Sequence, residues 1–469
     1  MRKKDGLNLI STRFLFVIIA VLFGLIFIKL TPPLWGLDET SHFARVYQLA
    51  HGDILPNVNQ NNYGGNIPDN LITLDDYVKG DLLDNKTGGV IARKDVDSRR
   101  TYQKLTDQSF SSKSRNYIWT AVYSPVAYIG PVIGVVIGDV FNASIGQTIF
   151  LARLTSLLLY IFIVWFSLRV LRDSKLRWLV FAVALLPASL YQATVVTADN
   201  ITIALSILFI SLLMALITKK PDSRNSKMLA GLIAAGILLP LVKLNYIFIS
   251  LAMIILPAKA FMRKRGELIK YSVAFLVTII SFAWSSIIKV SASAPVSQRP
   301  DGLKVDPAAQ LSFVSHHPLS FIEACIRTAG ANLDSYLQSG TGLIGWNYVP
   351  IPYVFILLLC LGLFIAAIYS KNELAGLHKR LILLAGFVVL GILGVFGALY
   401  IAFNPIGRSV IDGVQGRYFI PLAVPAILAV AAFIPIDLRI KNKVVPYLFS
   451  SISIVCLAVS VVYYYLMTY

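Results

Sequence analysis

The chain has 469 residues, of which 57% are hydrophobic and only 14% charged, and its mean hydropathy is +0.71. Because soluble domains carry about 25% charged residues, this composition excludes a soluble protein and indicates an integral membrane protein. The net charge of +18 would suit a nucleic-acid partner. The basic residues, however, cluster between apolar runs, as in proteins whose cationic loops stay in the cytoplasm. We therefore expect no nucleic-acid binding.

Apolar runs of about 18 or more residues recur along the chain and predict many membrane-spanning helices. The first run, 11–30, follows basic residues and precedes no small-residue cleavage site, so we interpret it as a retained helix with a cytoplasmic N-terminus. Placing each cation-rich loop inside gives about eleven spans in a multi-pass cell-membrane protein. The other predicted spans are 149–169, 177–196, 201–217, 228–240, 246–256, 268–288, 348–369, 381–403, 418–434 and 444–466.

Two long polar segments lie outside the cell in this topology. Residues 31–122 form the first extracytoplasmic loop, whose middle part, 57–113, is predicted to be flexible. Residues 289–347 form the second. The intervening run 123–140 is broken by prolines and glycines. If it spanned, the cations of 169–177 would face outward, so we prefer a re-entrant or surface hairpin there and leave a true span open.

Four ionisable residues follow the first span within eight positions: Asp38, Glu39, His42 and Arg45. Two prolines just before them end the first helix, since proline lacks the N–H and restricts the residue before it. A new helix capped at Thr40 or Ser41 would place Asp38 and His42 on one face. The sequence thus predicts a reactive cluster at the membrane surface.

Further polar residues collect at the outer ends of the predicted spans. Ionisable groups near membrane depth are costly and tend to mark functional sites. Together with His42 and Arg45, the candidate substrate-binding residues are Tyr123, Arg153, Gln192, Asp199, Lys243, Tyr246, Arg417 and Tyr418.

Each candidate also has a structural interpretation that the sequence leaves open. Acids such as Asp38 and Glu39 are favoured at helix N-termini, and Asp199 could cap the span that follows it. Lys243 could extend its charge to the membrane surface. His42 could make a structural hydrogen bond instead of contacting a substrate.

An outer carboxylate with nearby cations suits group transfer from a lipid-anchored phosphate donor. The carboxylate, Asp38 or Glu39, would act as general base on an acceptor hydroxyl. Lysine and arginine would stabilise charge on the leaving phosphate. The chain shows neither a P-loop pattern nor a dinucleotide-binding GxGxxG, so a lipid donor fits better than a nucleotide.

The block Asp38-Glu39-x-x-His42-Phe43-x-Arg45 resembles a bacterial family of predicted membrane proteins of unknown function, placed in the GT-C glycosyltransferase clan. Further motifs of that family follow in order: Tyr123-Ser124-Pro125, Ala152-Arg153-Leu154, Gln192 with Asp199, Lys243-x-x-Tyr246, Gly345-Trp346 and Gln415-Gly416-Arg417-Tyr418-Phe419. The resemblance implies many helices, a large first outer loop with membrane-surface helices, a polyprenyl-phosphate-sugar donor and a catalytic acid, Asp38 or Glu39. Some clan members use a divalent metal; Asp38, Glu39 and His42 could ligate one, but we expect no metal or other cofactor.

We therefore expect an all-α polytopic membrane protein with GT-C-like architecture, forming a single domain over residues 1–469. Its expected function is an inverting glycosyltransferase that moves a sugar from a polyprenyl-phosphate donor to a cell-envelope polysaccharide or glycolipid. The alternatives are a transporter or flippase for a lipid-linked glycan, and a non-catalytic scaffold of an envelope-synthesis complex. The concentration of polar residues on one side favours the enzyme.

Overall fold

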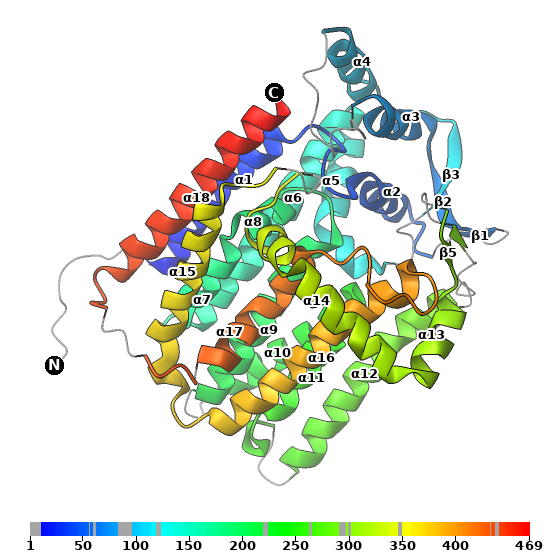
Figure 1. The fold of residues 1–469 in the computed structure, drawn as a ribbon. Helices are drawn as coiled ribbons and strands as arrows, with labels where there is room; N and C mark the ends of the chain where they lie inside the picture. Colours follow the sequence, from blue (N-terminus) through cyan, green and yellow to red (C-terminus); the bar gives the residue numbers. More distant parts are fainter. Residues whose placement is uncertain are drawn as a thin grey trace.

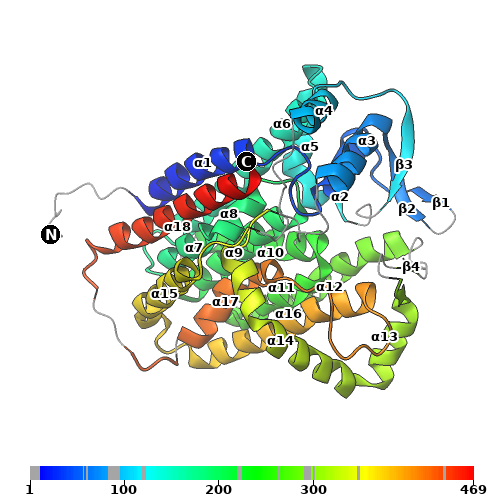
Figure 2. The same cartoon turned by 45° about the horizontal axis from the view of Figure 1, so that its top comes forward.

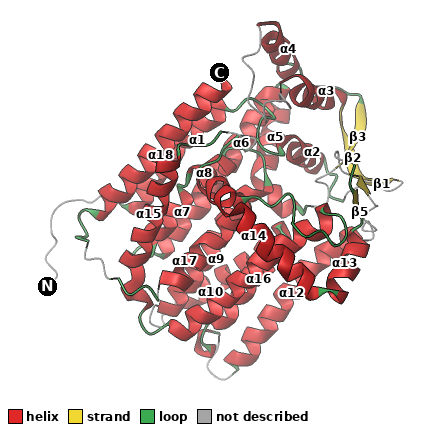
Figure 3. Cartoon of the chain, viewed as in Figure 1, coloured by secondary structure: helices red, strands yellow, loops and turns green. Residues whose placement is uncertain are grey.

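The computed structural model describes residues 11–55, 57–59, 62–82, 96–118, 123–218, 224–261, 265–289, 297–298, 302–345, 349–431, 433–436 and 440–469. In these parts the protein is a bundle of α-helices with a small layer of short helices and strands at one corner (Figure 1). The strands are confined to that corner (Figure 3). The predicted helical membrane protein is therefore confirmed in outline.

Seven α-helices in the described parts of the chain are long and apolar enough to cross a membrane. They are α1 (Thr12–Leu30), α6 (Ile145–Val170), α9 (Ala198–Thr218), α12 (Gly266–Lys289), α15 (Tyr353–Ser370), α16 (His378–Phe403) and α18 (Val445–Thr468). A short 3₁₀ turn, η6 (Lys371–Leu374), follows α15. Each long helix overlaps one predicted span, so these seven predictions are confirmed as helices of membrane-crossing length.

Four predicted spans are short or interrupted. The run 177–196 is divided into α7 (Arg177–Ala184) and α8 (Pro187–Ala193), because Pro187 disfavours helical backbone in the residue before it. The predicted span 228–240 lies in α10 (Arg224–Val242). The predicted span 246–256 is divided among η3 (Leu244–Tyr246), α11 (Ile247–Leu251) and η4 (Ala252–Ile255), and η5 (Ala258–Ala260) follows. The predicted span 418–434 corresponds to η7 (Gly416–Phe419) and α17 (Ile420–Ala431). In the described residues, seven helices are long enough to cross a membrane, and the predicted number of eleven spans is not confirmed.

Residues 31–122, the predicted first outer segment, are folded where the structure describes them. The elements are α2 (Glu39–Ala50), β1 (Asn57–Asn59), β2 (Asn62–Pro68), α3 (Asp69–Tyr77), the π-helix η1 (Val78–Leu82), α4 (Val96–Thr106) and β3 (Ser114–Ile118). The strands form an antiparallel sheet in the order β1-β2-β3, with Asn66 opposite Asn116. Ile67, Leu71 and Leu74 are fully buried, which anchors this layer to the bundle (Figure 2). The expectation of a flexible 57–113 is wrong for these residues; its positions 60–61 and 83–95 lie outside the described residues.

The run after this segment forms η2 (Pro125–Tyr128) and α5 (Ile129–Val140). At 1.5 Å per residue, the twelve residues of α5 extend about 18 Å, less than the roughly 30 Å of a hydrocarbon core. α5 packs closely along α6, where Gly134 lies against the backbone of Ala152. The prediction that 123–140 does not span the membrane stays a prediction.

The second outer segment carries β4 (Ser297–Gln298), β5 (Lys304–Val305), α13 (Pro307–His316) and α14 (Pro318–Thr341). β4 and β5 pair antiparallel. α13 begins at a proline after Asp306, whose side chain caps the helix by accepting from the Ala309 N–H. Trp346, part of the predicted Gly345-Trp346 motif, lies outside the described residues.

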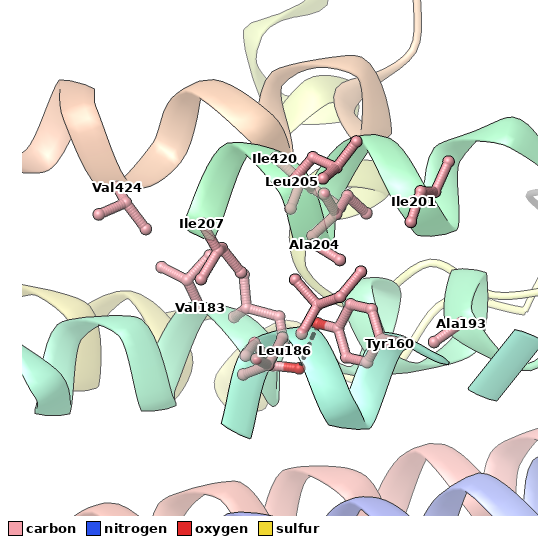
Figure 4. Packing of buried hydrophobic residues seen from close by; sticks show 14 of the residues in the cluster. Tyr160, Val183, Leu186, Ala193, Ile201, Ala204, Leu205, Ile207, Ile420 and Val424 are labelled. Atoms are coloured by element: carbon pink, nitrogen blue, oxygen red, sulfur yellow. Dashed lines mark hydrogen bonds between the residues drawn. The ribbon is translucent and has the colours of Figure 1, made fainter. Parts of the chain in front are cut away.

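The core of the bundle surrounds α9. In the most apolar part of this helix, 83% of the residues are buried, the highest share among the seven long helices. Figure 4 shows Leu205 and Ile207 of α9 among side chains from α6, α7 and α17. There Tyr160 satisfies its buried hydroxyl by donating to the Ala184 carbonyl, 2.9 Å away. The middle of α9 therefore packs against these three helices (Figure 4), and its start lies at one end of the bundle.

That end of the bundle also holds the ends of α1 and α18. The Tyr469 hydroxyl donates to the Leu30 carbonyl at 3.1 Å, so the two helices run side by side in the same direction (Figure 2). α2 follows α1 directly, and α4 lies near the start of α6. The first outer segment therefore covers the end at which α1 finishes and α6 and α9 begin.

Candidate functional site

The link between α1 and α2 places the two acids. α1 ends at Leu30, as its following prolines predict, and α2 begins at Glu39. Asp38 lies at the N-cap with φ of 58°, a left-handed conformation that Asp tolerates better than most residues. The predicted caps, Thr40 and Ser41, are wrong, because both lie inside α2. The Asp38 side chain makes no capping hydrogen bond either, so its carboxylate is available for other partners.

Glu39 is completely buried and fully engaged. Its Oε1 accepts from Arg153 Nε at 2.7 Å and from the Val196 N–H at 3.0 Å. Its Oε2 accepts from Arg153 Nη2 at 2.5 Å and from the Gly36 N–H at 2.9 Å. Arg153 also donates to the carbonyls of Thr31 and Pro32. Glu39 therefore joins the α1–α2 link, α6 and the segment before α9.

Asp38 belongs to a different group of charges. Its Oδ2 accepts from Arg417 Nη2 at 2.9 Å, and Arg417 Nε lies 3.5 Å from Asp199 Oδ2. The other oxygen of Asp199 accepts from the ammonium of Lys243. Arg417 and Asp199 are 4% and 3% exposed, whereas Asp38 is 50% exposed. The result is a row of alternating charges, Asp38–Arg417–Asp199–Lys243, with one accessible carboxylate at its end.

Four separate elements supply this row of charges. Asp38 precedes α2, Asp199 lies in the first turn of α9, Lys243 lies in the break after α10, and Arg417 is in η7. α10 contains Pro240, which weakens its last turn. Because removal of one partner from a buried ion pair leaves an uncompensated charge, these contacts hold the four elements in register.

Tyrosine rings surround the cations. Lys243 Nζ lies 5.2 Å from the centre of the Tyr418 ring and 6.0 Å from that of Tyr123, within the range of cation–π attraction. The Arg417 guanidinium lies 5.0 Å from the Tyr418 ring. Tyr246 donates its hydroxyl to the Tyr418 carbonyl at 2.9 Å, which fixes η7 against η3.

His42 lies one helical turn after Asp38 and is buried. Its Nδ1 is 2.6 Å from the Tyr128 hydroxyl, and its ring centre is 5.6 Å from that of Tyr123. Burial lowers the pKa of His42 from its ordinary value of 6.5 to about 4. At neutral pH the imidazole is therefore uncharged and shares a hydrogen bond with the Tyr128 hydroxyl.

Eight of the predicted site residues thus form one cluster, and Glu39 with Arg153 forms a second pair beside it. Arg45 does not belong to either group. Its guanidinium donates to the carbonyls of Asp53 and Ile54 and so holds the loop after α2. Gln192 in α8 is 4% exposed, and its Oε1 has no hydrogen-bond partner among the described residues. The eight clustered residues are Asp38, His42, Tyr123, Asp199, Lys243, Tyr246, Arg417 and Tyr418.

Sequence reasoning did not find Tyr128, the partner of His42. The two residues are 86 positions apart, so no local spacing connects them. The available signal was its position five residues after Tyr123 at the outer end of the same run. In the described parts of the chain, no group of three His, Cys, Asp or Glu side chains could hold a metal ion.

The sequence also matches a known family model over most of its length. The model for a predicted membrane protein (DUF2142) covers residues 21–426. The chain belongs to this family. All the clustered residues of this DUF2142 protein, from Asp38 to Tyr418, lie within the matched range. No curated protein and no solved structure matches the chain.

Proposed function

We propose that the protein is an inverting membrane glycosyltransferase with GT-C-like architecture. It moves a sugar from a polyprenyl-phosphate donor to a cell-envelope polysaccharide or glycolipid. The observation that carries the proposal is Asp38, a half-exposed carboxylate at the end of a row of buried charges that contains two cations. Glu39 is an unsuitable base, because its oxygens already accept four hydrogen bonds.

In the proposed reaction Asp38 removes the proton of the acceptor hydroxyl. The resulting oxygen attacks the anomeric carbon and displaces the lipid phosphate, which inverts that carbon in one step. Arg417 and Lys243 stabilise the negative charge that develops on the phosphate. Asp199 contacts both cations and positions them.

The proposal includes the topology expected from the cationic loops. About eleven spans place the Asp38 end of the bundle outside the cell, where lipid-linked sugars can serve as donors without nucleotides. The ionisable residues of this end do not continue deeper into α9, whose later residues are apolar or carry hydroxyl groups; Ala204, Leu205 and Ile207 are buried there. A flippase would need a polar path through both halves of the membrane, so this distribution favours the enzyme.

The test compares envelope glycan composition in wild type, a deletion, and the Asp38→Asn variant. We expect the deletion to lose one sugar and Asp38→Asn to reduce its transfer by about 10²–10⁴-fold, the usual contribution of a general base. Asp107→Asn, an exposed acid of the same segment, is the matched control and retains transfer. A normal glycan in Asp38→Asn together with a changed glycan in the deletion would favour the flippase or the scaffold.

Glu39→Gln is expected to fail in a different way. It leaves the Arg153 guanidinium buried without a counter-charge, and breaking a buried pair costs about 3–5 kcal/mol. We expect less folded protein in the membrane for Glu39→Gln and wild-type amounts for Asp38→Asn, measured by size-exclusion chromatography of detergent extracts.

A further inference from the structure

A cavity of about 430 Å³ opens at the end of α1, outside the row of charges that contains Asp38. Its size falls within the roughly 300–1,000 Å³ of small-molecule sites. The walls come from the α1–α2 link, α4, the first turns of α6 and the end of α18 (Figure 2). The lining residues are Ile28, Lys29, Thr31, Pro32, Pro33, Trp35, Arg99, Tyr102, Gln103, Gly146, Phe150, Arg153, Thr468 and Tyr469.

The charged side chains of this cavity are all cationic. Lys29 and Arg99 are exposed, Arg153 is 2% exposed and already paired with Glu39, and no Asp or Glu side chain is among the lining residues. Trp35 is 1% exposed, and its indole N–H has no hydrogen-bond partner among the described residues. The two exposed cations, Lys29 and Arg99, suit a phosphate, which is anionic and accepts hydrogen bonds.

Apolar side chains lead from the cavity along the bundle. Ile28 and Phe150 lie in its wall, and Phe150 is 42% exposed. Beyond the cavity, α1 and α6 each carry further exposed apolar residues. These residues are spaced three, four or eight positions apart along their helix, so they lie on one face of it. These residues are Leu25, Leu22, Ile18 and Phe14 on α1, and Leu158, Phe162 and Phe166 on α6.

We propose that this cavity binds the phosphate of an anionic membrane lipid, whose hydrocarbon chain lies along α1 and α6. Lys29 is the last lysine of α1, at the depth where lysine reaches lipid headgroups. The two exposed apolar faces supply a surface for the chain, which a free phosphate would not use. The proposal does not rest on the proposed glycosyl transfer, since Asp38 is not among the lining residues.

The test measures binding of fluorescent phosphatidic acid to the purified full chain in detergent, with phosphatidylcholine of the same chains as competitor. Each basic group near a membrane surface contributes about fivefold to the binding of anionic lipid. Lys29→Gln and Arg99→Gln should therefore each weaken binding about fivefold, and the double variant more. Lys104→Gln removes a charge from an exposed position of α4 that does not line the cavity, and it should change nothing.

Three further results decide the proposal. Asp38→Asn retains phosphatidic acid binding if the two sites are separate. Unlabelled phosphatidic acid displaces the fluorescent probe. At the same concentration, phosphatidylcholine and inorganic phosphate leave the probe bound. If the double variant binds phosphatidic acid as well as the wild type does, the proposed site is wrong. If inorganic phosphate displaces the probe as effectively as the unlabelled lipid does, the proposed role of the hydrocarbon chain is wrong.

Discussion

Asp38 and Glu39 are neighbours in the chain, yet their carboxylates have different surroundings. Asp38 is the N-cap with a left-handed backbone, whereas Glu39 is the first residue of α2. The Glu39 side chain is buried in the protein, and the Asp38 side chain is half exposed. Glu39 meets Arg153 and two backbone N–H groups, whereas the half-exposed Asp38 meets Arg417 through one of its two oxygens. The exposed acid keeps the lone pairs that a general base needs.

His42 gives the protein a pH-dependent stability. The folded state holds its pKa near 4 against 6.5 ordinarily, so below pH 6.5 the unfolded chain binds the proton more readily. The stabilisation is complete above pH 6.5 and decreases as the pH falls toward 4. We expect a loss of about 2 kcal/mol between pH 7 and pH 5. Thermal unfolding in detergent measures it, and His42→Gln should show a smaller decrease over this interval. Equal decreases in both proteins would contradict this assignment.

At the level of elements, the contact between α5 and α6 depends on small residues. A Cβ placed on Gly134 would lie 2.4 Å from Ala152 Cα and 2.5 Å from its backbone nitrogen, and backbone atoms cannot rotate away. Gly134→Ala should therefore lower the stability by about 1–3 kcal/mol through overpacking. The matched control is Gly386→Ala in α16, where a Cβ meets nothing within 4 Å. A comparison of their melting temperatures checks this, and equal values would exclude the close packing of α5 on α6.

The elements differ in how well the sequence predicts them. Long apolar runs such as α9 and α16 are predicted because their length alone separates them from other structures. The division of α7 from α8 at Pro187 was missed, since hydropathy averages across one proline. β2 was taken for part of a flexible loop because its Asn and Gly residues are poor strand formers. It is held instead by pairing with β1 and β3 and by contact with α3.

In the candidate site, too, the sequence predicted features that depend on nearby residues and missed those that depend on residues far apart in the chain. Its residues were predicted individually, because ionisable groups at the ends of apolar runs stand out. Their partners were not predicted, since Asp38 and Arg417 are 379 positions apart and meet only in the folded bundle. The choice between Asp38 and Glu39 depended on those partners, and so the sequence left it open.

At the scale of the whole molecule, the two ends of the bundle differ in charge and in structure. The end with α2 and the strands carries the Asp38 cluster. The opposite end carries Arg13, Arg172, Lys175 and Arg177 around a second cavity of about 560 Å³. Loops rich in lysine and arginine stay in the cytoplasm in most membrane proteins, which predicts that the Asp38 cluster lies outside the cell.

Labelling of single cysteines tests this orientation. Lys113 lies exposed between α4 and β3, and Lys443 lies exposed just before α18. A maleimide that cannot cross membranes should modify Lys113→Cys in intact spheroplasts, and Lys443→Cys only after detergent is added. The wild-type chain is the control for background, because Cys325 and Cys456 are buried and Cys360 is half-buried. The reverse pattern would place Asp38 in the cytoplasm, where nucleotide-linked sugars are available, and would remove the main argument for a lipid-linked donor.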